Sequence, residues 1–360
     1  RIVDPRAWTA AALGGSLGAG EAYMEGWWEC DDLTGLVRLL IRNRAALEVM
    51  DGWWRRFIGP AQRVAYWMQR NNRAGSKRNI AAHYDLSNEF FGLFLDPTMT
   101  YSCAVFENGA RTLEEASVEK LDRLCRRLEL RSEHHLLEIG TGWGTMALHA
   151  AGKYGCRVTT TTISKEQARL ARERIAAAGL SDRVEVIERD YRDLEGEYDR
   201  IVSVEMIEAV GAEHYGTFFG TCARLLKRDG AMAVQAITIR DSYFARAAKS
   251  RDWLKKHIFP GSCLTSVSAM MDGVRRASDL TLHHLEDIGP HYATTLGEWK
   301  ERFEARIDDV RAMGFDERFI RMWRYYLCYS AGAFAERHAG DVQMVLARPM
   351  WRGAREGWSR

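Results

Sequence analysis

The sequence lacks long hydrophobic runs, regularly spaced cysteines and any strong imbalance of charge. No run approaches the roughly 18 apolar residues of a membrane-spanning helix. The 7 cysteines are an odd number with no C-x-x-C pair, which argues against a disulfide scaffold, gives no zinc motif and is typical of reduced thiols in a cytosolic protein. The net charge of +2 argues neither for nor against a nucleic-acid partner, and nothing suggests nucleic-acid binding by stacking platforms.

What is present is enough apolar material for a large core, since 46% of the 360 residues are hydrophobic. A chain of this length exceeds the usual size of a single core, so we expect two packed units. The first is a small helical unit over residues 1–75, with tryptophan pairs at Trp27-Trp28 and Trp53-Trp54. Arginines lie off the apolar stripe of a helix predicted over 53–68, which indicates either a solvated basic face or a patch that contacts anionic phospholipid.

Strand and helix patterns alternate through most of residues 76–360. This order predicts a doubly wound, Rossmann-like α/β fold with a parallel sheet, in which ligands bind beyond the carboxyl ends of the strands. The predicted strands cover 136–139, 157–163, 183–188, 199–204, 231–237, 281–286 and 342–347. Residues 241–330 interrupt the alternation, and we interpret them as a helical lid over an apolar substrate, with plain core packing as the alternative.

A glycine-rich turn follows the first predicted strand, in Leu136-Leu-Glu-Ile-Gly-Thr-Gly-Trp-Gly144. Such a turn lets backbone N–H groups approach a ligand, because glycine has no Cβ. A dinucleotide site has the spacing G-x-G-x-x-G, whereas this turn reads G-x-G-x-G after the acidic Glu138. The pattern suits a ligand without phosphate and with a cationic amino-acid part, such as S-adenosylmethionine. A simple tight turn is the alternative.

Further segments accompany this turn in a fixed order along nearly the whole chain. They lie at 15–28, 83–91, 95–103, 201–211, 258–261, 291–296 and 325–334. With them the chain resembles the cyclopropane fatty-acyl-phospholipid synthase family, which comprises S-adenosylmethionine-dependent methyltransferases similar to the mycolic acid cyclopropane synthases. The resemblance implies a class I methyltransferase domain over 76–360, preceded by a lipid-contacting domain over 1–75.

The resemblance also implies a reaction. The double bond of an unsaturated phospholipid acyl chain takes the cofactor's methyl group, and loss of a proton from the resulting carbocation closes a cyclopropane ring. Family members hold bicarbonate as the base, and the corresponding cage residues are Cys103, Glu208, Gln235, Ile237 and Tyr292. Glu208 would share a proton with the anion, since a carboxylate beside an anion is tolerable only in that way.

The cofactor-binding residues implied by the same resemblance surround the glycine turn and three later strand ends. They are Tyr101, Ser102, Glu138, Gly140, Thr141, Gly142, Trp143, Gly144, Thr162, Ile163, Gln167, Asp190 and Tyr191. Two of them have competing local explanations. Gln167 is also the expected capping partner of Ser164, and Asp190 is also explained as the end of its strand.

Two departures from the family pattern keep alternatives open. Gln235 stands where many members have histidine, and glutamine cannot take up a proton. A methyl- or methylene-branched product, a carrier-bound acyl substrate and, from a different class, a catalytically silent lipid-binding protein therefore remain alternatives. Ser330 replaces a cysteine of some members, with Cys328 nearby, which argues against a covalent cysteine mechanism.

The basic and aromatic character of the N-terminal unit favours intact phospholipid as substrate. We expect a cytoplasmic protein, peripheral to the inner face of the cell membrane. Its expected partners are unsaturated phospholipid acyl chains and an anionic membrane surface, with no nucleic acid. A homodimer is compatible with lipid binding on two sides.

Overall fold

The computed structural model describes residues 1–44, 87–250 and 252–353. The basic helix predicted over 53–68 lies outside these residues, as do the boundary near 75 and residues 83–86 of the segment 83–91. Within the described ranges, no helix combines the length and the apolar composition needed to cross a bilayer.

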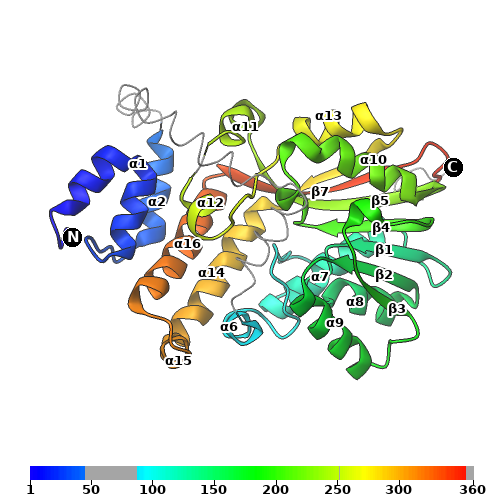
Figure 1. The fold of residues 1–360 in the computed structure, drawn as a ribbon, viewed down its shortest axis with the longest axis horizontal. Helices are drawn as coiled ribbons and strands as arrows, with labels where there is room; N and C mark the ends of the chain where they lie inside the picture. The colour runs from blue at the N-terminus through cyan, green and yellow to red at the C-terminus, as the bar shows by residue number, and fades with distance from the viewer. Residues whose placement is uncertain (45–86, 251, 354–360) are drawn as a thin grey trace.

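A seven-stranded sheet forms the centre of the fold (Figure 1). Its strands are β1 His135–Ile139, β2 Arg157–Thr162, β3 Val184–Glu188, β4 Tyr198–Val204, β5 Leu226–Ile239, β6 Thr281–Asp287 and β7 Ala339–Ala347. They lie in the order β3-β2-β1-β4-β5-β7-β6. The first five strands pair in parallel, and β7 pairs antiparallel with both β5 and β6.

The predicted α/β fold and its strands are confirmed, but the sheet is mixed rather than wholly parallel. The chain leaves β6 at the carboxyl edge of the sheet and forms helices there before it returns as β7. A segment that leaves and re-enters at the same edge must run in the opposite direction. The reversed strand β7 is the physical consequence.

Helices cover both faces of the sheet (Figure 1). One face carries α7 Leu113–Arg127, α8 Thr145–Tyr154 and α9 Lys165–Ala177, and the other carries α10 Tyr215–Leu225 and α13 Val267–Ala277. The apolar stripe at Leu121, Leu124, Cys125 and Leu128 is buried against β1, as its helical spacing predicts.

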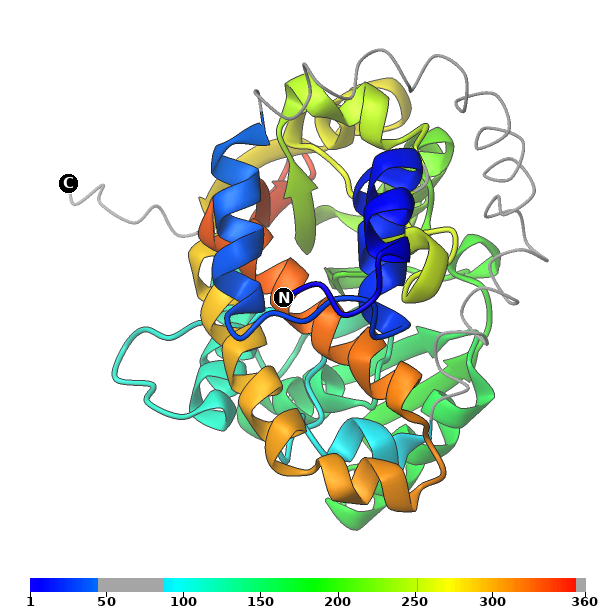
Figure 2. The same ribbon diagram turned by 90° about the vertical axis from the view of Figure 1, so that its left-hand side faces the viewer.

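A third group of helices stands beyond the carboxyl ends of the strands (Figures 1 and 2). It consists of α1 Arg6–Met24, α2 Leu33–Arg42, α6 Asn88–Gly92, α11 Asp241–Ala247, α12 Trp253–His257, α14 Gly289–Ala305, α15 Ile307–Ala312 and α16 Glu317–Ala335. The segment 241–330 therefore contributes both the edge strand β6 and much of this helical group.

The N-terminal helices share one aromatic core with α14 and α16. Tyr23, Trp299 and Trp323 are buried in the same cluster. The helix α2 reaches α16 closely because Gly332 has no side chain, and a Cβ there would lie 2.7 Å from Cγ1 of Val37. The described part of the N-terminal unit is thus packed onto the helices that stand over the sheet edge.

Candidate active site

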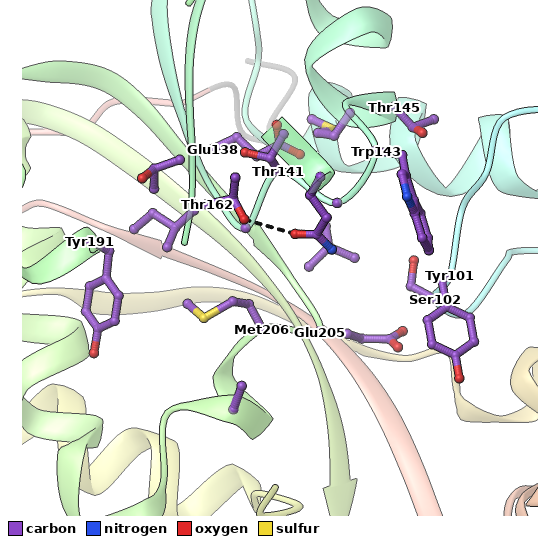
Figure 3. A pocket seen from close by; sticks show the side chains of 18 of the residues that line it. Tyr101, Ser102, Glu138, Thr141, Trp143, Thr145, Thr162, Tyr191, Glu205 and Met206 are labelled. Atoms are coloured by element: carbon purple, nitrogen blue, oxygen red, sulfur yellow. Dashed lines mark hydrogen bonds between the residues drawn. The ribbon is translucent and has the colours of Figure 1, made fainter. Parts of the chain in front are cut away.

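A cavity of about 230 Å³ lies beyond the carboxyl ends of β1, β2 and β4 (Figure 3). Every predicted cofactor residue except Gly144 lines it. The same cavity is also lined by Lys120, Glu205 and Met206, which were not among the predicted site residues. Four loops that are far apart in the sequence therefore meet at one place, as expected for the strand ends of this fold.

The three glycines of the turn have different surroundings. All have positive φ, at +102° for Gly140, +50° for Gly142 and +84° for Gly144. No atom lies within 4 Å of a Cβ built on Gly142, so its backbone is open to a ligand. A Cβ on Gly144 would lie 3.1 Å from Cβ of Ala171 on α9. Gly144 therefore serves the packing of α8 against α9 rather than the cavity.

Glu138 places a carboxyl group in the wall of the cavity, where it is only 4% exposed. Its Oε2 is buried and has no hydrogen-bond partner among the described residues. Burial raises the pKa of the Glu138 carboxyl to about 8, against the opposing effects of Thr160 and Lys120. A buried carboxyl group with an unused oxygen suits a cationic ligand. Together with the open backbone at Gly142, it fits S-adenosylmethionine.

Gln167 and Asp190 both line the cavity, in addition to their local roles. The backbone N–H of Gln167 donates to the Ser164 hydroxyl at 3.3 Å, which caps α9. The Gln167 side chain is held by the Thr162 hydroxyl, which donates to Oε1 at 2.9 Å (Figure 3). The Asp190 carboxylate pairs with Arg192. Capping therefore uses only the backbone of Gln167.

The donors predicted to hold bicarbonate converge on a carboxylate of the chain itself. Oε1 of Glu205 accepts from the Cys103 backbone N–H at 2.8 Å and from Nε2 of Gln235 at 2.8 Å. Oε2 of Glu205 accepts from the Tyr292 hydroxyl at 2.7 Å. The fifth predicted residue, Ile237, donates its backbone N–H to Glu208. Every one of these donors is thus engaged by a glutamate, and bicarbonate does not fit this arrangement.

The thiols of Cys103 and Cys328 are buried. The Cys103 thiol donates to the Ala104 carbonyl at 3.3 Å and is fully buried, which raises its pKa well above the usual value. Burial also raises the pKa of the Cys328 thiol. Neither thiol is poised as a nucleophile, because a thiolate is required for attack.

Three further titratable groups surround Glu205. Asp341 of β7 is fully buried, and burial together with Glu205 raises its pKa well above the usual value. Glu208 is 7% exposed, and burial raises its pKa to about 8. Lys120 is 1% exposed and donates to the Ser102 hydroxyl at 2.8 Å. Two carboxyl groups with raised pKa values and one buried lysine are therefore placed around Glu205.

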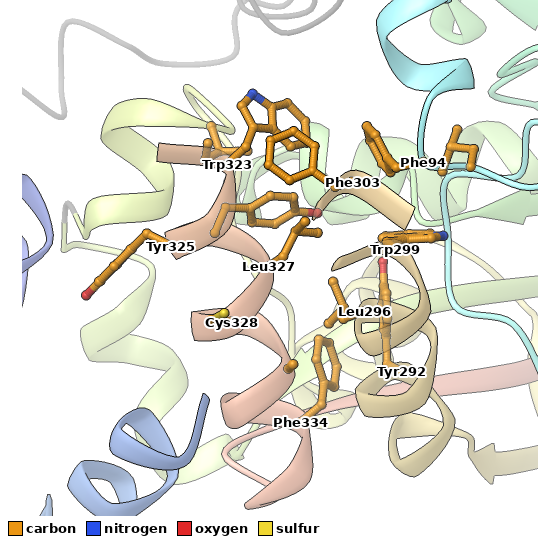
Figure 4. Close-up of a cluster of buried hydrophobic side chains, with 14 of the residues drawn as sticks. Phe94, Tyr292, Leu296, Trp299, Phe303, Trp323, Tyr325, Leu327, Cys328 and Phe334 are labelled. Atoms are coloured by element: carbon orange, nitrogen blue, oxygen red, sulfur yellow. The ribbon is translucent and has the colours of Figure 1, made fainter. Parts of the chain in front are cut away.

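Buried side chains of α14 and α16 form an aromatic wall (Figure 4), and the ring centroid of the cavity residue Tyr101 lies 5.1 Å from that of Trp299. Tyr292 stacks on Phe334 with ring centroids 4.4 Å apart, and its ring lies 6.1 Å from Trp299. The Tyr101 and Tyr326 hydroxyls lie 2.9 Å apart. Aromatic faces favour a nearby cation, and the apolar surroundings exclude water.

Sequence reasoning missed Glu205, Asp341 and Lys120. Glu205 was visible as a second carboxylate three residues before Glu208, immediately after β4. Nothing in the sequence marked which of the two faces the cavity. Asp341 reaches the site only through the pairing of β7 with β5, which places it opposite Ile237. A lysine inside the apolar pattern of α7 was a signal for a buried, functional cation.

Comparison with known proteins places the chain in a family. Residues 71–344 match the family model described as mycolic acid cyclopropane synthetase. The chain belongs to that family. It is 41% identical over 341 residues to a tuberculostearic acid methyltransferase of Mycobacterium tuberculosis, which covers 93% of this chain and 79% of that protein. It is 37% identical over 361 residues to a cyclopropane-fatty-acyl-phospholipid synthase of Escherichia coli, covering 99% of this chain and 89% of the relative.

Solved structures agree with this assignment. A mycolic acid cyclopropane synthase complexed with SAH and CTAB has a TM-score of 0.70 and 33% identity, covering 75% of this chain and 98% of that one. The cyclopropane synthase MmaA2 from Mycobacterium tuberculosis has a TM-score of 0.70, 30% identity and the same coverage. The family member described here is an S-adenosylmethionine-dependent methyltransferase with the class I fold.

Proposed function

We propose that this methyltransferase acts on the double bond of an unsaturated phospholipid acyl chain and closes a cyclopropane ring. The observation that carries the proposal is a cofactor cavity that meets a buried aromatic wall, with Glu205 at the junction. The family and the Escherichia coli relative named for phospholipids support the same reaction class.

The chain's residues would divide the work between the two halves of the site. When bound, S-adenosylmethionine supplies an electrophilic methyl group. Glu138 and the open turn at Gly142 hold its cationic amino-acid part, and Gln167 is oriented by Thr162 on the cavity wall. Tyr292 presents its ring to the acyl chain, where it stabilises positive charge on carbon and keeps water out.

A branched product is the second candidate. The relative with 41% identity is named for tuberculostearic acid rather than for a cyclopropane product. Both outcomes begin with the same methyl transfer to an alkene. They differ in the fate of the carbocation, which is decided by the group that removes a proton.

The test is an assay of the purified full chain with isotopically labelled S-adenosylmethionine and vesicles of an unsaturated phospholipid. We expect labelled fatty esters that gain one CH2, lose their alkene proton signals and show high-field ring protons by NMR. Vesicles of a saturated phospholipid with the same headgroup are the matched control. A methyl- or methylene-branched ester would favour the second candidate, and the absence of any labelled ester would refute both.

We further propose that the protein meets its substrate as a peripheral protein at a membrane surface. Large apolar side chains are exposed on the two N-terminal helices, with Trp8 66%, Leu13 56%, Leu39 57% and Leu40 44% exposed. These helices lie at the end of the molecule away from β1, β2 and β3 (Figure 1). Exposed tryptophan and leucine on helices suit burial at the boundary between headgroups and acyl chains.

A further inference from the structure

We propose that the Glu205 carboxylate is the resident base of this enzyme and takes the place of a bound bicarbonate. The inference rests on the proposed function and identifies the group that ends the reaction. It follows from where the donors point: the Cys103 backbone N–H, the Gln235 amide and the Tyr292 hydroxyl all donate to the two oxygens of Glu205. An anion site whose donors already hold a carboxylate has no need of a second anion.

The backbone conformation of Glu205 supports a functional role. Its φ is +46°, in the left-handed region that a glycine would adopt without cost. For a residue with a side chain this conformation costs about 1–2 kcal/mol, and such strain persists mainly at functional sites. The strain turns the carboxylate from the end of β4 into the cavity wall, where the side chain remains partly accessible.

Gln235 has a clear purpose in this arrangement. Its Nε2 carries two N–H groups, and it donates to Glu205 at 2.8 Å and to Oδ2 of Asp341 at 3.1 Å. Its Oε1 accepts from Gln343 at 3.0 Å, which fixes the orientation of the amide. Gln235 is fully buried and acts as a positioning residue. An amide that cannot titrate is sufficient, because the proton goes to Glu205.

The surrounding groups include a second buried carboxyl group and a buried lysine. Burial, followed by the neighbouring Glu205, raises the pKa of the Asp341 carboxyl well above its usual value. Burial lowers the pKa of the Lys120 ammonium group, and the nearby Glu205 opposes that lowering. A carboxylate has about four acceptor positions. Three are filled by the donors named above, and the Asp341 side chain also hydrogen-bonds to Glu205.

The step balances without another reactant. The alkene electron pair forms the new carbon–carbon bond, and the pair of the breaking carbon–sulfur bond stays on sulfur. The carbocation then loses one proton from the new methyl group to Oε2 of Glu205, and the freed C–H pair forms the third bond of the ring. A carboxylate is a sufficient base, because a carbocation is a far stronger acid than a carboxylic acid. Glu205 returns its proton to solvent before the next turnover.

The first test needs no substitution. We measure the initial rate of the wild-type full chain on unsaturated phospholipid vesicles in buffer purged of carbon dioxide, with and without added sodium bicarbonate. The two rates should agree within about twofold. A wild-type rate that collapses without bicarbonate would overturn the inference while leaving the proposed function intact. A wild-type enzyme that forms no product under either condition would refute the proposed function instead.

The second test uses two substitutions at the same position. Glu205→Gln fills the site with a neutral amide, and Glu205→Gly opens it. Both should lower turnover by about 100-fold or more, the usual range for a lost base, with S-adenosylmethionine affinity by calorimetry changed by less than about fivefold. Added bicarbonate or formate should raise the turnover of Glu205→Gly at least about tenfold and leave the turnover of Glu205→Gln unchanged. A purely structural role would not produce this difference in rescue.

The control is Glu195→Gln, because Glu195 is exposed on a loop outside the cavity. It should keep the wild-type rate. Thermal melting of each variant verifies folding. Glu205→Gln with a near wild-type rate, or rescue that is equal in both variants, would show that Glu205 is not the base.

Discussion

Glu138 illustrates how a single buried residue can make cofactor binding depend on pH. In the free protein its pKa is about 8, so the carboxyl is mostly protonated at pH 7. A cationic ligand beside it favours the ionised form and lowers that pKa. Binding of S-adenosylmethionine at pH 7 should therefore release up to one proton. The affinity should rise with pH up to about 8 and then level off.

Calorimetry in two buffers with different ionisation enthalpies measures this proton release directly. Glu138→Gln should bind more weakly, with an affinity that no longer rises between pH 6 and about 8. The matched variant is Glu195→Gln, which should retain both the proton release and the pH dependence. Proton release that is unchanged in Glu138→Gln would assign it to another group.

For single residues, the sequence predicted those that line the cofactor cavity better than it predicted the proposed base, Glu205. Glycine spacing and an acidic residue at a strand end are local signals, and the residues around them do line the cavity. The contacts of Glu205 are not local. Gln235 and Asp341 are 106 positions apart in the chain and meet only because β5 and β7 pair in one register. No pattern along the sequence encodes such a meeting.

Two glycines of the same turn have different roles. Gly144 serves the packing of α8 against α9, and Gly142 lies beside the cofactor cavity. Gly144 and Gly142 both have positive φ, so alanine costs about 1–2 kcal/mol at either position. At Gly144 the new Cβ would also press on Ala171 of α9, and at Gly142 it would stand in open space beside the cavity. We expect Gly144→Ala to lower the melting temperature by about 3–6 °C with little effect on cofactor affinity.

Gly142→Ala is the matched comparison on the same turn. It should lower the affinity for S-adenosylmethionine by more than Gly144→Ala does, since its Cβ occupies space beside the ligand. Differential scanning fluorimetry and calorimetry on both variants compare the two quantities. A larger loss of affinity in Gly144→Ala would place Gly144 in the binding site after all.

For the whole molecule, alternation of strands and helices was enough to predict the sheet, because each strand carries its own apolar pattern. The direction of β7 and the shared core of α1, α2, α14 and α16 were not predictable in the same way. The direction of β7 depends on the edge of the sheet from which the chain leaves β6. The shared core depends on which apolar faces of helices distant in the sequence pack together. Gly332 allows the close contact between α2 and α16. In the sequence alone nothing distinguishes it from other glycines.

The N-terminal end of the molecule offers two different forces for membrane binding, and they respond differently to salt. Three described arginines of this end are paired with carboxylates, since Arg6 lies 2.6 Å from Asp4, and Arg38 and Arg42 each lie 2.7 Å from Glu336. Exposed pairs of this kind leave little net charge to attract lipid. The apolar side chains Trp8 and Leu13 remain, and burying each is worth about 1.5–3 kcal/mol.

We therefore expect a Trp8→Ser and Leu13→Ser double variant to bind anionic vesicles at least tenfold more weakly in co-sedimentation, at low and high salt alike. Leu282→Ser, on the edge strand β6, is the control for an exposed apolar residue elsewhere, and its binding should stay near the wild-type value. Any part of wild-type binding that falls with salt then belongs to the arginines between positions 53 and 78. If the double variant binds like the wild type and binding disappears in salt, charge rather than apolar burial brings the enzyme to its substrate.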